Sequence, residues 1–226
     1  MAYDFDKIAL DYDRMNHLMT LGLDRCWRRR AVKGLHGKVL DVACGTGDMI
    51  VELQKHGCNV TGVDLSEEMM AIARQKAPTA TYMIADAEHL PFSGETFDAV
   101  TCAFGVRNFV HLEQGLKEML RVLKPGGRMV ILELATPDSP LVSPFYNLYT
   151  RHIIPCLGQH IVGSREAYTY LPSSIERFPK GEAFLDIIHH LPISIHHLPI
   201  SIHHCCHRRF TFGVCRMYLI NKEAAQ

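Results

Sequence analysis

At 226 residues, 47% hydrophobic and 21% charged, the chain has the size and composition of one ordinary globular domain. Lysine plus arginine and aspartate plus glutamate number 24 each, so no overall field favours nucleic acid as a partner. The first residues are acidic and lack an apolar run, which argues against a signal peptide, and no run in the chain reaches membrane-span length. Eight scattered cysteines without a Cys-x-x-Cys pair argue against a disulfide framework, so a reduced cytoplasmic chain is expected.

Residues 3–34 are expected to form two helices ahead of the sheet, because apolar residues recur at helical spacing and Leu21-Gly22-Leu23 separates two runs. These helices either pack against the domain or form a lid over a bound cofactor, and the surroundings of Tyr12 favour the lid. The second helix is basic, and its charges form either a solvated face or a contact with anionic lipid headgroups; they are Arg25, Arg28, Arg29, Arg30 and Lys33.

The stretch 39–48 predicts a buried strand that runs into a glycine turn and then a helix. Gly45-Thr46-Gly47 lets the backbone approach a ligand closely, and a helix that begins there offers free N–H groups. A dinucleotide site would require a third glycine where Ile50 stands. Asp64 closes the next strand and is placed to accept hydrogen bonds from a ribose. The pattern favours S-adenosylmethionine over a dinucleotide; a glycine turn without a ligand is the remaining alternative.

From Lys38 to about Leu134, strand and helix patterns alternate, which predicts βαβ units and a mostly parallel sheet with helices on both faces. The expected strands are 38–43, 59–63, 81–84, 98–104 and 128–134. The expected helices are 47–56, 67–76 and 111–122. Right-handed crossovers bring the carboxyl ends of these strands to one edge, where ligands of open α/β sheets bind.

Two further groups fall on that edge. Asp86, with Ala87, follows the third strand and either accepts from an adenine amino group or caps its own loop. Arg107 and Asn108 follow the fourth strand and are placed to orient a polar group of the substrate. The alternative for Arg107 is an ion pair with a surface carboxylate.

Residues 137–180 combine prolines with aromatic residues and several apolar residues. The segment therefore predicts a helical insertion that forms either a second wall of the substrate cleft or ordinary domain packing. The aromatic residues are Phe145, Tyr146, Tyr149, Tyr168 and Tyr170.

Residues 189–207 hold a tandem repeat: His-His-Leu-Pro-Ile-Ser-Ile occurs twice and a third copy breaks into Cys205-Cys206-His207. Seven of the fourteen histidines lie here. The spacing matches no zinc finger, so a loosely packed low-complexity insertion is favoured over a metal site. Strand-like alternation resumes over 208–220.

Residues 40–48 resemble the first motif of class I S-adenosylmethionine-dependent methyltransferases. Further stretches, in matching order from about residue 5 to 187, resemble the ubiquinone/menaquinone biosynthesis C-methyltransferase family. These stretches are 12–19 with Gly22 and Trp27-Arg28, 85–88 with 90–92, 104–108, 121–127, and 168–172 with Ser174-Ile175.

The resemblance implies a single Rossmann-like α/β methyltransferase domain over 1–226, divided into a helical lid (3–34), a cofactor-binding core (38–134), a substrate-side insertion (137–180), the histidine-rich repeat (189–207) and a C-terminal antiparallel strand (208–220). It implies S-adenosylmethionine as the cofactor, and no metal site is expected. The cofactor-binding residues that it implies are Asp41, Gly45, Thr46, Gly47, Asp64, Leu65, Asp86, Ala87 and Ala103. After Ile188 the chain departs from the family, which puts the sixth strand in doubt.

The implied reaction is methyl transfer to a ring carbon of a polyprenylated quinol, either demethylmenaquinol or its methoxy-benzoquinol counterpart. Arg107, Asn108 and Tyr12 are the expected catalytic residues, with Arg107 as counter-charge to a phenolate; Tyr12, His17 and His152 are candidate proton acceptors. The prenyl tail predicts peripheral membrane contact without a span, and self-association into a homodimer stays open. The alternatives are a methyltransferase for another small molecule, and a non-catalytic protein that binds S-adenosylmethionine or a metal.

Overall fold

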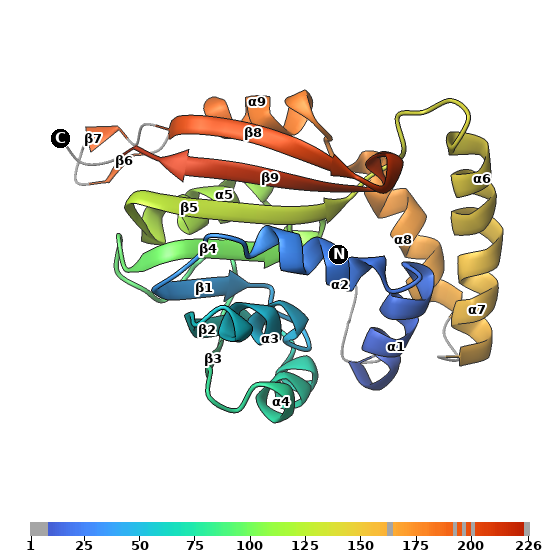
Figure 1. Ribbon diagram of the computed structural model, residues 1–226, viewed down its shortest axis with the longest axis horizontal. Coiled ribbons are helices and arrows are strands. Elements are labelled where there is room, and N and C mark those ends of the chain that lie inside the picture. Colours follow the sequence, from blue (N-terminus) through green and yellow to red (C-terminus); the bar gives the residue numbers. More distant parts are fainter. Residues whose placement is uncertain (1–8, 162–164, 192–193, 196–197, 200–201, 224–226) are drawn as a thin grey trace.

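The computed structural model describes residues 9–161, 165–191, 194–195, 198–199 and 202–223, and the account of its elements covers those ranges. A seven-stranded sheet in the order β3-β2-β1-β4-β5-β9-β8 forms the centre (Figure 1). Five strands are parallel: β1 (Lys38–Val42), β2 (Asn59–Asp64), β3 (Thr81–Ile84), β4 (Phe97–Ala103) and β5 (Leu123–Leu134). β9 (Cys215–Lys222) is antiparallel to β5, and β8 (Ile202–Phe210) is antiparallel to β9. The mostly parallel α/β sheet predicted from the sequence is confirmed.

Helices cover both faces of this sheet, which is why its central strands read as continuous apolar runs. Val39 packs in one cluster with α2 (Leu23–Ala31), α3 (Asp48–Lys55) and α4 (Glu67–Lys76). Its neighbour Leu40 packs in the opposite cluster, with α5 (Leu112–Val122) and α9 (Glu182–His189). α2 is therefore a core helix, because Trp27 and Ala31 are buried against the sheet.

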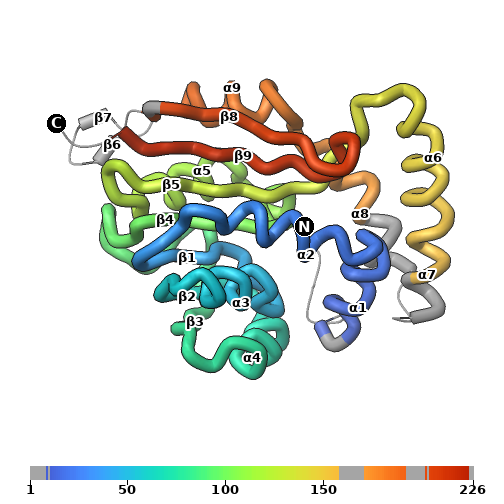
Figure 2. The backbone as a smooth tube through the Cα atoms, in the orientation of Figure 1, coloured from blue at the N-terminus to red at the C-terminus, as the bar shows by residue number. Residues whose placement is uncertain are grey.

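A second group of helices lies beyond the carboxyl ends of the parallel strands (Figures 1 and 2). It contains α1 (Ala9–Met19), α6 (Ser143–Leu148), the π-helical turn η3 (Tyr149–Ile153), α7 (Ile154–Ile161) and α8 (Arg165–Arg177). α1 contacts both α4 and α7, so it crosses from the sheet to the inserted helices. Tyr168 and Tyr170 belong to α8, and their side chains lie outside the described residues.

The carboxyl-terminal part differs from the expected single strand over 208–220. Two strands occur there, β8 and β9, and the turn η4 (Thr211–Gly213) joins them. The last residue of the second copy, Ile202, and the third, broken copy, 203–207, supply the first half of β8, so the sixth strand that the repeat put in doubt is present. Upstream, β6 (Ser194–Ile195) pairs with β7 (Leu198–Pro199) in a short separate hairpin. The rest of residues 189–201 lies in part outside the described residues, so the loose packing predicted for the repeat stays a prediction.

Candidate active site

A cavity of about 350 Å³ opens where β1, β2, β3 and β4 end. Eight of the predicted residues line it: Tyr12, Gly45, Asp64, Leu65, Asp86, Ala87, Ala103 and Asn108. Other lining residues were not predicted as site residues, although Glu88 and Phe104 belong to stretches that carry the family resemblance; they include Ala43, Ser66, Met69, Glu88, Phe104, Phe109 and Val110. Four predicted residues, Asp41, Thr46, Gly47 and Arg107, are not among those that line the cavity.

The glycine turn and the end of β2 are fixed to each other by backbone donors. The Gly45 N–H donates to Asp64 Oδ2 at 2.8 Å, and the Ser66 N–H donates to Asp64 Oδ1 at 2.9 Å. Ser66 in turn caps α4, because its hydroxyl accepts from the Met69 N–H. The Asp64 carboxylate is therefore held in place at the cavity wall before any ligand binds.

Asp86 caps its own loop and also lies at the cavity wall, so the loop-capping interpretation is confirmed and the adenine contact stays a prediction. Its Oδ1 accepts from the Glu88 N–H at 2.9 Å, which closes the loop after β3, and the residue also lines the cavity. Glu88 is itself buried and accepts from the His111 N–H at the start of α5. The loop is thus anchored to the next helix along the chain.

Asp41 is buried behind the cavity, in the middle of the sheet. Thr101 in β4 donates its hydroxyl to Asp41 Oδ1 at 2.6 Å, while Oδ2 has no hydrogen-bond partner among the described residues. Burial raises the pKa of this carboxyl group to about 7. A buried acceptor of this kind, next to the glycine turn, fits a ligand that brings a positively charged donor such as an ammonium group.

Arg107 faces a buried carboxylate and not a surface one. It belongs to the turn η2 (Val106–Asn108), and its Nη1 lies 2.7 Å from Glu133 Oε1 in β5 and donates to the Phe104 carbonyl at 2.5 Å. Both side chains are nearly inaccessible, at 6% for Arg107 and 1% for Glu133. Sequence reasoning missed Glu133, although an acid inside the apolar run Val130–Leu134 was a signal that could have found it.

The arginine nevertheless acts on the cavity at short range. Burial raises the pKa of the Tyr12 hydroxyl, and the Arg107 charge is the largest effect that opposes this rise. Asn108, next in the chain, lines the cavity. Tyr12 and Asn108 line the cavity, and the charge of the buried Arg107 lowers the pKa of Tyr12 against the effect of burial.

Thr46 and Gly47 face the N-terminal helices and not the cavity. The Thr46 hydroxyl donates to the Asp13 carboxylate of α1, and Lys76 Nζ in α4 lies 2.7 Å from Asp13 Oδ2 and 2.5 Å from Asp48 Oδ1. The predicted cofactor loop is thus bound to the helix that carries Tyr12.

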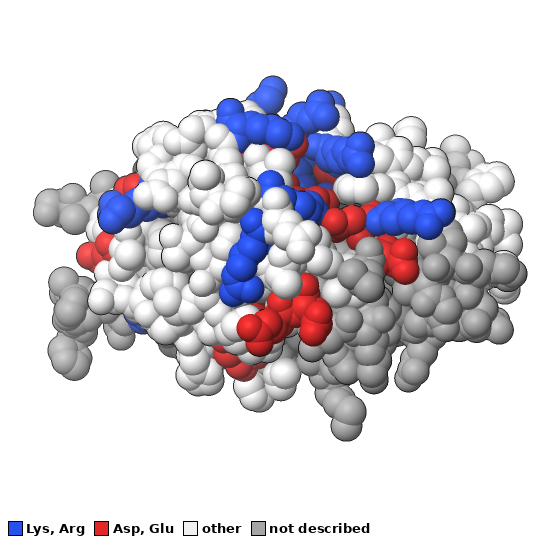
Figure 3. Space-filling model, turned by 90° about the horizontal axis from the view of Figure 1, so that it is seen from below, with Lys and Arg blue, Asp and Glu red and all other residues white. Residues whose placement is uncertain are grey.

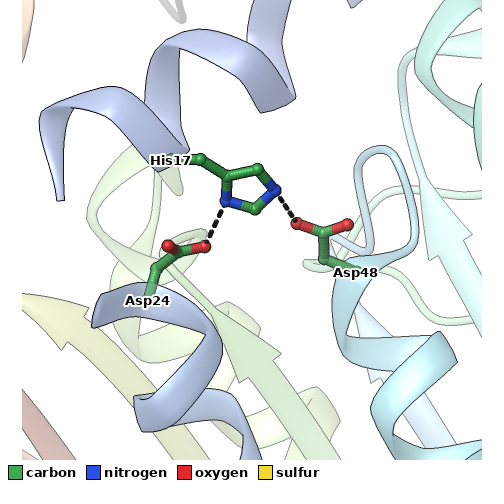
Figure 4. A group of neighbouring side chains, drawn as sticks. All are labelled: His17, Asp24 and Asp48. Atoms are coloured by element: carbon green, nitrogen blue, oxygen red, sulfur yellow. Dashed lines mark hydrogen bonds and ion pairs between the residues drawn. The ribbon is translucent and has the colours of Figure 1, made fainter. Parts of the chain in front are cut away.

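His17 extends this network and is not among the residues that line the cavity (Figure 4). Its Nδ1 lies 2.9 Å from Asp24 Oδ2 in α2, and its Nε2 lies 3.6 Å from Asp48 Oδ2 in α3. The trio has the spacing of metal ligands, but Arg28 and Lys76 already neutralise the two carboxylates at 2.5 Å each. The other candidate base, His152, is exposed in η3.

The model of the ubiE/COQ5 methyltransferase family matches residues 2–216. The chain belongs to this family. It is 40% identical over 232 residues to a demethylmenaquinone methyltransferase of Bacteroides fragilis, covering 96% of this chain and 90% of that one. Against the ubiquinone/menaquinone biosynthesis C-methyltransferase UbiE of Geobacter sulfurreducens, identity is 42% over 227 residues, covering 95% and 85%.

Solved structures show the same fold at lower identity. A SAM-dependent methyltransferase of Thermotoga maritima superposes with a TM-score of 0.66 at 21% identity, covering 97% of this chain and 98% of that one. Family and fold together make this chain a methyltransferase of the class that uses S-adenosylmethionine. Among the helices in the described ranges, none is long and apolar enough to cross a membrane.

Proposed function

We propose that the protein transfers a methyl group from S-adenosylmethionine to a ring carbon of a polyprenylated quinol, with demethylmenaquinol as the first substrate and its methoxy-benzoquinol counterpart as the second. The names of the Bacteroides and Geobacter relatives support the quinol class. The observation that carries the proposal is the cavity at the strand ends, which is lined by Asp64 and Asp86 together with Tyr12 and Asn108.

The cofactor is proposed to lie along the carboxylate side of this cavity. Asp64 would accept from the ribose, and Asp86 with Ala87 would contact the adenine. The Oδ2 atom of Asp41, which no described residue bonds, suits the ammonium group of the methionine portion. Thr46 and Gly47 would act indirectly, through the loop that they hold against α1. The bound cofactor supplies a methyl group made electrophilic by the adjacent positive charge.

The remaining wall is proposed to prepare the quinol. A ring carbon becomes nucleophilic when the neighbouring hydroxyl group gives its proton to water, so the wall must favour a phenolate. Once this carbon has taken the methyl group, the hydrogen that it carried also leaves as a proton to water, which restores the aromatic quinol and leaves the demethylated cofactor as the second product. Glu133 offsets part of the Arg107 charge, but the arginine still favours a charged hydroxyl at the wall, as its effect on the pKa of Tyr12 indicates, and Asn108 can donate to the phenolate oxygen. Because burial raises the pKa of Tyr12, this hydroxyl keeps its proton at neutral pH and acts as a second donor, not as the base.

The assay that tests this function supplies methyl-labelled cofactor and a panel of quinols that includes a naphthoquinol and a methoxy-benzoquinol, each with and without a short prenyl tail. We expect label on the naphthoquinol ring carbon, with the tail improving kcat/KM because it adds apolar contact. Label found only in a non-quinol acceptor would overturn the assignment.

Arg107 and Glu133 are tested as a pair. Arg107→Met should leave the Kd for cofactor within about twofold and lower kcat about 10²- to 10³-fold, since it removes the charge that favours the phenolate. Isothermal titration and single-turnover rates measure the two quantities. Loss of cofactor binding in this variant would move Arg107 from the quinol side to the cofactor side.

The double variant Arg107→Met/Glu133→Gln is the matched control. The single substitution leaves Glu133 buried and without its arginine, which costs about 3–5 kcal/mol of unfolding free energy. The glutamine of the double variant removes that charge but keeps an acceptor for the Leu134 N–H, so stability should largely return while turnover stays low. Recovery of turnover together with stability would show that the arginine acts only structurally.

A further inference from the structure

An uncharged segment with exposed apolar side chains lies next to the candidate active site. No charged residue occurs between Asp138 and Arg151. Within this segment Leu141 is 82% exposed, Phe145 75% and Leu148 57%. Exposed apolar residues are ordinary when they occur singly, but a group of large ones on one segment marks a contact surface.

Two turns place further apolar side chains at their tips. Leu21, between α1 and α2, is 78% exposed, and Phe212, between β8 and β9, is 74% exposed. Both have positive φ values, 53° and 57°, in a region where a bulky residue is disfavoured and glycine or asparagine is preferred. Strained backbone that presents an exposed apolar side chain is a reason to look for function.

Hydrogen bonds and packing contacts bring the two turns and the uncharged segment together. The Tyr149 hydroxyl, just after α6, donates to the Met19 carbonyl next to the first turn. The Trp27 Nε1 donates to the Thr211 hydroxyl in the second turn. Gly213 packs against Pro137 and Asp138, which lead into α6. The three segments therefore form one continuous region at the end of the molecule where α6 stands (Figure 1). We define the apolar surface as Leu21, Leu141, Phe145, Leu148 and Phe212.

Basic side chains border the apolar surface. Arg25, Arg29 and Arg30 are exposed on α2, and Arg30 stacks on Phe210, two residues before Phe212. Asp24 is buried with Arg28 and Asp138 is paired with Arg216. Glu52 is paired with Lys55 at 2.8 Å and lies 4.0 Å from Arg29, so Arg25 and Arg30 are the α2 arginines without an ion pair among the described residues. Figure 3 shows Lys and Arg side chains gathered along one margin of the face that it displays. The border therefore carries positive charge that can meet an anionic partner.

The apolar surface is connected to the active site through α6. Burial raises the pKa of Tyr146 to about 12, and the Arg107 charge is the largest effect that opposes the rise. Tyr146 is half-buried, while its neighbours Phe145 and Leu148 are exposed, so α6 turns one side toward the protein and the other toward solvent. A quinol whose ring lies by Asn108 would have its tail directed along this helix toward the apolar surface.

We propose that the apolar surface inserts into the headgroup region of an anionic lipid bilayer, with the α2 arginines on lipid phosphates, so that a prenylated substrate enters the cavity without leaving the membrane. This inference rests on the proposed function, because the prenyl tail is the reason for a bilayer and not a second protein as the partner. The chemistry that recognises the bilayer is apolar side chains surrounded by cations, as in other proteins that bind at membrane interfaces.

The test is co-sedimentation of the full chain with vesicles of equal parts phosphatidylcholine and phosphatidylglycerol. The double variant Phe145→Ser/Phe212→Asn should partition at least about tenfold less, because each large apolar side chain contributes a factor of that order when buried. Asparagine suits the positive φ of residue 212, so this variant should fold. Met83→Ser is the matched control, since it removes an exposed apolar side chain on β3, the edge strand farthest from β8, and should bind as the parent does.

Activity and mass in solution separate the outcomes. On a quinol without a tail, the double variant should turn over at the parent rate, and on a prenylated quinol in vesicles it should be at least about tenfold slower. Equal vesicle binding by parent and variant overturns the proposal. So does a variant that changes only a dimer into a monomer, because the apolar surface would then contact a second copy. A parent that binds vesicles but methylates no quinol refutes the proposed function and leaves the lipid contact standing.

Discussion

At the scale of single residues, the environment of Asp41 is unfavourable for a charged carboxylate when no ligand is bound. It is 1% exposed, and the Thr101 hydroxyl satisfies one of its oxygens while the other meets no donor in the described part of the chain. Burial raises its pKa to about 7 because the charged form loses its hydration. The folded protein therefore holds a proton on Asp41 at pH values where the unfolded chain has released it.

This makes stability depend on pH in a defined direction. Because the pKa of Asp41 is higher in the folded protein than in the unfolded chain, the folded state is favoured when the carboxyl group is protonated. This contribution to the unfolding free energy is complete below the unfolded pKa of about 4 and is lost as pH rises toward 7, by roughly 4 kcal/mol at most. Asp41→Asn removes the titration, so the unfolding free energy of the variant minus that of the parent should grow as pH rises from about 5 to 8. Urea denaturation across that range measures the difference.

Saturating cofactor provides the second half of the same measurement. If its ammonium group meets Asp41, ligand should favour the ionised carboxylate and flatten the parent's pH dependence, and it should bind the variant about ten- to a hundredfold more weakly. Parallel stability curves for parent and variant would show that Asp41 does not titrate in this range.

Residue types at strand ends predicted the polar side chains of the cavity wall, because ligand-facing positions of a parallel sheet follow from strand order. Asp64, Asp86 and Asn108 all line the cavity. The direction of a side chain within a turn was not predictable in this way. Thr46 points to Asp13, 33 positions earlier in the chain, and Arg107 points to Glu133, and both partners depend on the packing of elements that are distant in sequence.

At the scale of elements, the contact between the start of α3 and the side of α4 fixes the glycine turn. Gly47 has φ of 82°, and a Cβ built on it would lie 2.9 Å from the Ala73 Cβ. Two requirements therefore select glycine here: the left-handed backbone and the close approach of a helix. Gly57 has a similar φ of 78°, but no atom of the described residues lies within 4 Å of its Cβ position.

These two glycines form a matched pair for substitution. Gly57→Ala should lower the unfolding free energy by about 1 kcal/mol, the cost of a left-handed alanine. Gly47→Ala should cost roughly 2–4 kcal/mol, because α3 and α4 must also separate, and it should weaken cofactor binding. Chemical denaturation and calorimetry measure both effects. Equal losses for the two variants would mean that the helix contact relaxes without strain.

β5 begins at Leu123, five residues before the expected strand, but most strands and helices between 38 and 134 were predictable from local signals such as the Ser66 cap of α4. β8 was not. Its first half has the sequence of a histidine repeat, and only pairing with β9 makes it a strand, from Ile202 against Lys222 to Phe210 against Cys215. Tertiary pairing overrides local composition at a sheet edge.

At the scale of the whole molecule, the repeat lengthens the connection between α9 and β8. The two full copies are identical, so deletion of 189–195 recreates the same junction after Ile188 and leaves β8 intact. We expect the unfolding free energy of this variant to stay within about 0.5 kcal/mol of the parent, because shortening a surface loop has a small entropic effect.

Thermal and urea denaturation check this expectation, with turnover as a second readout. The matched comparison is deletion of 202–208, which also removes seven residues but takes them from β8, and it should unfold that edge of the sheet. A loss above about 2 kcal/mol on deleting 189–195 would show that the repeat belongs to the core.

The position of the repeat has a practical side. His189, His190 and His204 are exposed, and the repeat leads to the end of the sheet where β6 and β7 lie, opposite the end formed by α6 (Figure 1). A nickel-chelating sensor chip that captures the untagged chain by these imidazoles would hold each molecule by the end of the sheet opposite α6. Ligand kinetics could then be recorded on a uniformly presented enzyme without an engineered handle.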